Sequence, residues 1–263
     1  SILLWDEKTL KTDIDDGFRH YLEIYTVQTE RPIGAVLICP GGGYCNRAPH
    51  EAEPVAQKFN QAGLHAFVVQ YRVHPHRHPA PLMDASQALR IIRHRADEWN
   101  VNPNRIAILG FSAGGHLAAS LGVHFDDECV KSTGILEHVS CRPDALILCY
   151  PVISSKEFAH LGSFKNLLGE NVSEEMLQKM SLELQVTDKT PPAFLWHTFE
   201  DAGVPVENSI LFAMALRKHN IPFELHVYPK GSHGLGLAED DPHVATWMEL
   251  CCQWLEDMEW KSS

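Results

Sequence analysis

The stretch that decides the fold is Ile106-Ala107-Ile108-Leu109-Gly110-Phe111-Ser112-Ala113-Gly114-Gly115. An apolar run leads to a serine that has a glycine two positions before it and another two positions after it. Small residues typical of a helix follow. This spacing is found where a strand turns sharply into a helix and presents a serine hydroxyl above a sheet. Side chains larger than those of Gly110 and Gly114 would collide in such a turn. Glycine-rich turns are common, so the remainder of the chain must support the prediction.

The composition is that of an ordinary globular protein. The chain has 263 residues, of which 44% are hydrophobic and 21% are charged, and we expect one α/β domain spanning residues 1–263. The formal net charge of -12 argues against nucleic acid and anionic membranes as partners, because both attract basic patches. No apolar run reaches the roughly 18 residues of a membrane span. The oligomeric state stays open, a homo-oligomer included.

Two further features of the sequence bear on the cellular compartment. The first eight residues, SILLWDEK, lack the basic start and long apolar stretch of a signal peptide. The chain has seven cysteines, an odd number, and Cys39, Cys149 and Cys251 lie inside apolar runs. This pattern favours buried free thiols over a disulfide framework. We therefore expect a reducing compartment and a cytoplasmic protein.

Strands alternate with helices from residue 35 to the end. Short runs rich in β-branched and aromatic residues predict strands, and apolar residues at helical spacing predict helices. The pattern predicts a mostly parallel sheet with helices on both faces, and a ligand site beyond the carboxyl ends of the strands. Residues 1–20 show no clear period, and Asn102-Pro103-Asn104 predicts a turn before the strand that leads to Ser112. The predicted strands are 21–27, 35–39, 66–71, the run ending at 111, 145–150, 193–197 and 223–228, and the predicted helices are 51–62, 82–100, 112–125, 206–219 and one from 242 to 258.

Residues 154–190 differ from the rest of the chain. They are more polar, contain short helical fragments such as 173–180 and show no strand pattern. We interpret them as a small cap-like insertion that lies over the strand ends and helps to select the substrate.

Ser112 is followed along the chain by an acid and a histidine in the positions that nucleophilic catalysis needs. A serine hydroxyl requires a base to take its proton, and the base requires a third group that fixes its tautomer. Asp201 follows a predicted strand, and His233 follows the last strand in a glycine-flanked loop. All three would meet at one edge of the sheet, in the chain order serine, acid, histidine. We predict Ser112, Asp201 and His233 as the catalytic residues.

Two neighbours offer alternatives to this assignment. Glu200 precedes Asp201 directly and could be the acid instead. His197 lies at a strand end near the same edge, where we favour packing or a hydrogen bond that supports the site.

Developing negative charge on the substrate needs backbone donors. One is the N–H of the residue after the serine, Ala113, and another comes from the loop after an earlier strand. Gly41-Gly42-Gly43 lies in that loop, and we predict that it supplies the second donor, without singling out one of the three glycines. A phosphate-binding loop would need a lysine and a serine or threonine that are absent, and a dinucleotide fingerprint needs a different glycine spacing. We expect no cofactor.

Three histidines, His74, His76 and His78, share a proline-broken loop. No acidic or cysteine cluster accompanies them in the sequence, so we expect a solvated loop and no metal site. Cys45 lies near the glycine loop, but nothing in the sequence indicates that it is activated.

The motifs together resemble a known family. Pro40-Gly-Gly-Gly-Tyr44, Gln70-Tyr-Arg-Val73, Pro79-Ala-Pro-Leu-Met-Asp84, Gly110-Phe-Ser-Ala-Gly-Gly-His116, Asp201-x-x-Val-Pro205 and Gly231-Ser-His-Gly234 occur in the order seen in bacterial α/β-hydrolase esterases. The chain is similar to the acetyl esterase and xylan-esterase-like sugar hydrolase branch, which is related to the hormone-sensitive lipase group. Lipase-like members have histidine before the glycine run where this chain has Pro40, which favours the sugar-esterase branch.

The resemblance implies the α/β-hydrolase fold and the roles assigned above to Ser112, Asp201 and His233. It implies Gly42, Gly43 and Ala113 as the backbone donors to the oxyanion, and structural roles for Arg72 and Asp84. It also implies hydrolysis of short acyl esters, with acetyl groups on a small-molecule or oligosaccharide substrate as the leading expectation. A peptidase-like or arylformamidase-like hydrolase on the same machinery remains an alternative. A non-catalytic binding protein that kept the fold is a further one.

Overall fold

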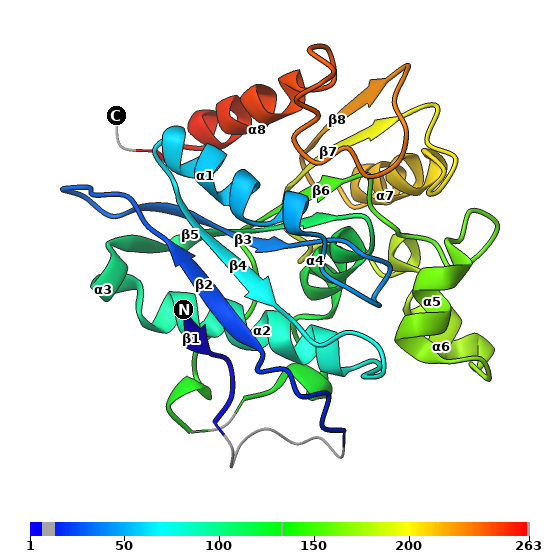
Figure 1. Cartoon of the computed structure of the whole chain (residues 1–263), viewed down its shortest axis with the longest axis horizontal. Coiled ribbons are helices and arrows are strands. Elements are labelled where there is room, and N and C mark those ends of the chain that lie inside the picture. Colours follow the sequence, from blue (N-terminus) through cyan, green and yellow to red (C-terminus); the bar gives the residue numbers. More distant parts are fainter. Residues whose placement is uncertain (7–13, 133, 262–263) are drawn as a thin grey trace.

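A twisted sheet forms the centre of the molecule (Figure 1). The computed structural model describes residues 1–6, 14–132 and 134–261, and within them the sheet has eight strands in the spatial order β1-β2-β4-β3-β5-β6-β7-β8. The pairs β1–β2 and β2–β4 are antiparallel, and all other pairs are parallel. The strands are β1 Ile2–Leu3, β2 Tyr21–Tyr25, β3 Ile33–Cys39, β4 His65–Gln70, β5 Val101–Phe111, β6 Ala145–Cys149, β7 Ala193–Thr198 and β8 Phe223–Tyr228.

Helices cover both faces of the sheet, as the alternating pattern predicted. One apolar cluster joins one face of the sheet to α2, α4 and α7, and the other joins the opposite face to α1 and α8; Figure 1 shows α1 and α8 on one side and α2 on the other. The central strands β3 and β6 are buried along their whole length, which explains their continuous apolar sequences. The helices are α1 Glu53–Gln61, α2 Ala80–His94, α3 Ala96–Trp99, α4 Ala113–His124, α5 Leu161–Leu168, α6 Glu174–Lys179, α7 Glu207–Lys218 and α8 Thr246–Asp257, with short 3₁₀ turns at Pro49–Glu51, Glu128–Val130, Gly134–Leu136 and Leu182–Leu184.

The turn predicted at Asn102–Asn104 lies inside β5. Val101 pairs with Ile33, and pairing with β3 resumes only at Ile106. The intervening residues bulge outward, and the amide N–H of Asn104 donates to the side chain of Asn102. A proline is compatible with a strand at such a bulge, so the local turn exists but does not end the strand.

The single long helix predicted over 82–100 is interrupted at Arg95. The carbonyl of Arg95 accepts a hydrogen bond from Glu98, three residues later, and this tighter turn separates α2 from α3. Trp99 at the end of α3 packs against Phe67 of β4, with ring centroids 5.0 Å apart.

The loop between β4 and α2 differs from the predicted solvated loop. His74 is exposed, but the side chain of His76 is only 3% exposed and lies 3.2 Å from the carboxylate of Asp16. The N-terminal segment that showed no sequence period supplies Asp16, so the contact could not be foreseen from the loop itself. The expectation of a solvated loop is therefore wrong for His76.

Residues 154–190 contain α5, α6 and one 3₁₀ turn, in line with the predicted short helical fragments. The side chain of Ser173 accepts the N–H of Met176 and caps α6. The side chain of Asn166 in α5 donates to the carbonyl of Gly43, so this segment contacts the glycine loop after β3.

None of the helices in the described ranges is both long enough and apolar enough to cross a membrane.

Candidate active site

Ser112 occupies the turn between β5 and α4 in a strained conformation. Its φ is 54° and its ψ is -119°, a region that non-glycine residues rarely adopt. A Cβ on Gly110 would lie 1.9 Å from the carbonyl oxygen of Gly114, and a Cβ on Gly114 would lie 2.1 Å from that of Cys39. The two glycines therefore permit the close approach of backbone segments on which the turn depends.

The structure brings the three predicted catalytic side chains together. Ser112 Oγ lies 2.8 Å from His233 Nε2, and His233 Nδ1 lies 2.6 Å from Asp201 Oδ2. Because Asp201 can only accept when ionised, His233 Nδ1 carries the proton and Nε2 is free to accept from the serine hydroxyl. This hydrogen-bonded series is the arrangement in which an imidazole can act as the base for a serine.

Asp201 is held in place by donors on several sides. Its Oδ1 accepts the backbone N–H groups of Gly203 and Val204 at 2.9 and 2.8 Å. His197 Nε2 donates to the carbonyl of Val204 and lies 3.4 Å from Asp201 Oδ2. Burial opposes ionisation, but the hydrogen bonds from His197, His233 and Val204 outweigh it and lower the pKa of Asp201. The carboxylate is therefore ionised throughout the neutral range, and His197 supports it.

Glu200, the alternative acid, has different surroundings from those of Asp201. Its side chain is exposed, and its nearest hydrogen bond is from the backbone N–H of Gly231 at 3.4 Å. In this structure the carboxylate that contacts His233 is therefore that of Asp201.

The glycine loop after β3 lies directly against the serine. A Cβ on Gly41 would lie 3.1 Å from the Cβ of Ser112, and Gly42 and Gly43 have φ of 133° and 62°, which glycine adopts readily. The N–H of Gly41 donates to Glu51. Among the loop and cap hydrogen bonds of the described residues, none uses the N–H of Gly42, Gly43 or Ala113, so these three groups have no backbone acceptor there.

Glu51 connects two of the loops that surround the site. Its buried carboxylate accepts the N–H of Gly41 through Oε2 at 2.7 Å and the hydroxyl of Tyr150 through Oε1 at 2.6 Å. The Tyr150 hydroxyl in turn accepts the N–H of Gly236 at 2.7 Å, and its ring packs edge-on to His233. One carboxylate thus ties the glycine loop to the segment that carries His233.

His116 supports the far end of the glycine loop. Its Nε2 lies 2.8 Å from the carbonyl of Met180, which can only accept, so Nδ1 accepts the hydroxyl hydrogen of Tyr44 at 2.9 Å. Complete burial lowers the pKa of His116 to about 4. The imidazole therefore stays neutral at physiological pH and fixes Tyr44, which follows Gly43 in the loop.

Helix α5 and the residue before it lie near the site. His160 precedes α5 and accepts the N–H of Ser163. Burial and the nearby imidazole of His233 lower the pKa of His160. Leu161, which follows His160, is 77% exposed. Phe199, which precedes Glu200, is 71% exposed.

Sequence reasoning missed Glu51, Tyr150 and His160. Glu51 looked like an ordinary first residue of an amphipathic helix, and Tyr150 looked like the last residue of a buried strand. Only the three-dimensional contacts described above place these residues around the site, and no spacing in the sequence indicates them.

The sequence is similar to a known protein family and to several characterised relatives. The BD-FAE family pattern matches residues 22–216, well over half of the chain. An endo-1,4-beta-xylanase B from Butyrivibrio fibrisolvens is 43% identical over 90% of this chain and 38% of its own length. An acetylxylan esterase from Xylanibacter ruminicola is 35% identical over 87% of this chain and 45% of its own length. The chain thus spans less than half the length of either relative.

A solved structure covers the chain almost completely. The crystal structure of an acetyl ester-xyloside bifunctional hydrolase from Caldicellulosiruptor lactoaceticus has a TM-score of 0.94 and 49% identity, and the match covers 99% of this chain and 97% of that one. An α/β-hydrolase from a deep-sea metagenome library has a TM-score of 0.72 and 32% identity, covering 90% and 92%. The predicted fold class and resemblance are confirmed: the chain has the α/β-hydrolase fold and belongs to the BD-FAE family.

Proposed function

We propose that this protein is a serine esterase that removes short acyl groups, acetyl above all, from carbohydrate esters. The observation that carries the proposal is the hydrogen-bonded series from Ser112 Oγ through His233 to Asp201, beside three N–H groups without a backbone acceptor among the loop and cap hydrogen bonds of the described residues. Esterases and an acetyl ester hydrolase among the relatives support the reaction class.

The proposed reaction proceeds through an acyl-enzyme. Ser112 Oγ attacks the ester carbonyl carbon while His233 Nε2 takes its proton, and the carbonyl oxygen becomes an oxyanion. The N–H groups of Gly42, Gly43 and Ala113 donate to that oxygen. When the intermediate collapses, the bond to the alcohol breaks and His233 gives its proton to the leaving oxygen. Water then repeats the sequence and releases the carboxylic acid and the free serine.

The proposed substrate class is supported by the names of the relatives and by one exposed aromatic side chain. The xylanase, acetylxylan esterase and acetyl ester-xyloside hydrolase among the relatives bear names that refer to xylan or xylosides. In this chain the exposed ring of Phe199 lies two residues before Asp201, where its apolar face could pack on the carbon-bound hydrogens of a sugar. We propose acetylated xylo-oligosaccharides as the substrates to test first.

The test is turnover of p-nitrophenyl acetate and of acetylated xylo-oligosaccharides by the wild type and by Ser112→Ala. We expect Ser112→Ala to lose at least about 10³-fold in kcat on both substrates, because it removes the nucleophile. Retained turnover in the variant would refute the nucleophile assignment. A formanilide or a peptide that is hydrolysed faster than both esters would favour the arylformamidase or peptidase alternative.

A further inference from the structure

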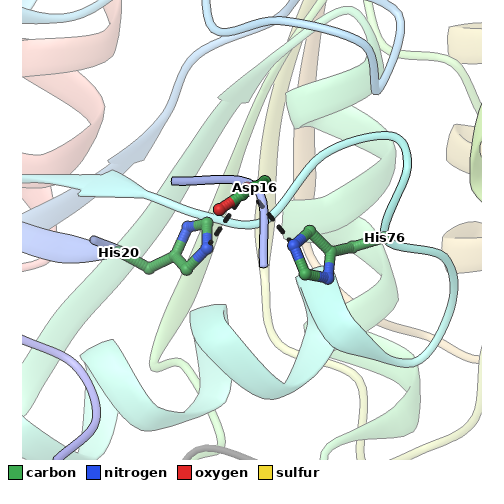
Figure 2. A group of neighbouring side chains, drawn as sticks. All are labelled: Asp16, His20 and His76. Atoms are coloured by element: carbon green, nitrogen blue, oxygen red, sulfur yellow. Dashed lines mark ion pairs between the residues drawn. The ribbon is translucent and has the colours of Figure 1, made fainter. Parts of the chain in front are cut away.

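A second group of reactive side chains lies away from the candidate active site and shares no residue with it. Asp16 and His20 belong to the N-terminal segment, and His76 belongs to the loop between β4 and α2. Figure 2 shows the three side chains pointing toward one another. One possible ligand atom from each residue lies within 4.8 Å of the other two. Asp16 Oδ2 lies 3.2 Å from His76 Nε2 and 3.6 Å from His20 Nε2.

These separations are compatible with a metal ion shared by the three side chains. Ligands that each lie about 2.0–2.2 Å from a tetrahedral zinc ion are roughly 3.4 Å apart, which the two measured separations bracket. The distance from Asp16 to His20 is longer than a hydrogen bond. His20 Nδ1 is also buried and has no hydrogen-bond partner in the described part of the chain. The side chain of His20 is only 4% exposed, and the other ring nitrogen, Nε2, is the one that faces Asp16.

The backbone fixes the carboxylate in the required orientation. Asp16 Oδ1 accepts the N–H of Phe18 at 2.9 Å, which directs Oδ2 between the two imidazoles. The ring of Phe18 packs at a tilt against His20, with centroids 5.3 Å apart. Partners of this kind orient metal ligands and tune their affinity.

The cluster can be reached from solvent. A cavity of about 450 Å³ adjoins His20, and Asp6, Asp15 and Arg19 are among its lining residues. The side chain of Asp16 is 18% exposed, so an ion could reach the cluster from solvent.

We propose that Asp16, His20 and His76 bind one divalent transition-metal ion, with zinc as the cation that two imidazoles and one carboxylate suit well. A water molecule would complete the coordination. The ion would join the N-terminal segment to the loop between β4 and α2, whose His74 N–H donates to the carbonyl of Tyr44. The site is structural, and its occupation would stabilise the protein and the position of that loop.

The experiment is calorimetric titration of the EDTA-treated full chain with ZnCl₂ near neutral pH, with Co²⁺ absorption as a second readout of ligand type. We expect one equivalent of zinc to bind to the wild type. Asp16→Asn, His20→Gln and His76→Gln should each lower the affinity by about tenfold or more. Bound zinc should also raise the melting temperature of the wild type by several degrees, more than that of the three variants.

Adventitious binding is tested by a matched variant. His226 forms a half-exposed pair with Glu224 at 2.6 Å, so His226→Gln should bind zinc as the wild type does. Asp16→Asn is nearly isosteric and partly exposed, so folding should survive; circular dichroism and p-nitrophenyl acetate turnover check this. No zinc uptake by the wild type, or equal uptake by the wild type and the three ligand variants, would overturn the proposal.

Discussion

At the scale of single residues, Asp201 is the carboxylate that accepts hydrogen bonds from both backbone N–H groups and His233 in the candidate active site. Its Oδ1 is occupied by two backbone N–H groups, and Oδ2 faces His233. Asp201→Asn would keep the acceptor for the backbone but place an uncharged amide beside His233 Nδ1. We expect kcat on p-nitrophenyl acetate to fall by about 10⁴-fold, because the wrong imidazole tautomer is favoured and the imidazolium loses its counter-charge.

Glu200→Gln is the matched control, since it changes the neighbouring carboxylate in the same way. Glu200 is exposed and does not contact His233 in the structure, so kcat should stay within about twofold of the wild type. A large loss in Glu200→Gln together with a small one in Asp201→Asn would exchange the two roles.

A second residue-scale prediction concerns pH and His116. The pKa of His116 falls from an ordinary 6.5 to about 4 in the folded protein, so the unfolded chain takes up a proton at a higher pH than the folded one. The contribution of His116 to stability is complete above pH 6.5 and is lost as the pH falls toward 4. Between pH 7 and pH 5 the loss amounts to about 2 kcal/mol, at 1.36 kcal/mol per pKa unit.

Urea unfolding of the wild type and His116→Gln at the two pH values measures this contribution. The glutamine amide can accept from Tyr44 and donate to Met180 but does not titrate. The wild type should therefore lose about 2 kcal/mol more than the variant between pH 7 and pH 5. Equal losses would mean that His116 is protonated in the folded protein as readily as in the unfolded chain.

The residues of the site were predictable to different degrees. Ser112, Asp201 and His233 follow strands at positions that parallel topology brings to one edge, so their proximity followed from their order in the chain. The contact of His116 with Tyr44 joins α4 to the loop after β3, and no local pattern encodes it. The cluster around His76 was missed for the same reason, because Asp16 lies in a segment without any periodicity.

At the scale of elements, Glu51 joins the loop after β3 to the segment that carries His233. Glu51→Gln would keep one acceptor oxygen but direct an amide NH₂ at the donor N–H of Gly41 or at the hydroxyl of Tyr150. We expect the loop to shift, and kcat on p-nitrophenyl acetate to fall by about 10- to 100-fold, because backbone donors act only when correctly placed. The KM should change much less than kcat if the role is positioning.

Glu53→Gln, at the first residue of α1 and two residues after Glu51, provides the control. Glu53 is exposed and contacts Gln57 in its own helix, so both kinetic constants should match those of the wild type. Melting temperatures of the two variants separate positioning from unfolding. An unchanged kcat in a folded Glu51→Gln variant would contradict the positioning role.

Most elements were predictable to within a few residues because each has the period of its burial pattern. The exceptions have physical causes. The bulge in β5 lets four residues pass outside the sheet while the strand continues, and a turn signal alone cannot distinguish this from a strand end. The interruption of the predicted helix at Arg95 involves neither proline nor glycine, so nothing in the local sequence indicates it.

At the scale of the whole molecule, the topology follows from the alternation of strands and helices, while the electrostatic field follows from composition alone. A net charge of -12 produces a negative potential that extends about 30 Å at 0.01 M salt and is screened within about 10 Å at 0.1 M. Such a field lowers the local concentration of anionic substrates around the entire protein and leaves neutral ones unaffected.

The consequence is measurable with two esters of similar length. p-Nitrophenyl hemisuccinate carries a carboxylate where p-nitrophenyl valerate carries a terminal ethyl group, so their ratio of kcat/KM combines a fixed steric factor with a charge factor. Only the charge factor depends on salt. We expect kcat/KM for the hemisuccinate, relative to the valerate, to rise at least about twofold between 0.01 and 0.5 M NaCl, because screening removes the repulsion. If this ratio of kcat/KM does not change with salt, basic groups near Ser112 offset the net charge locally. The acidic surface would then have no part in selecting neutral carbohydrate esters.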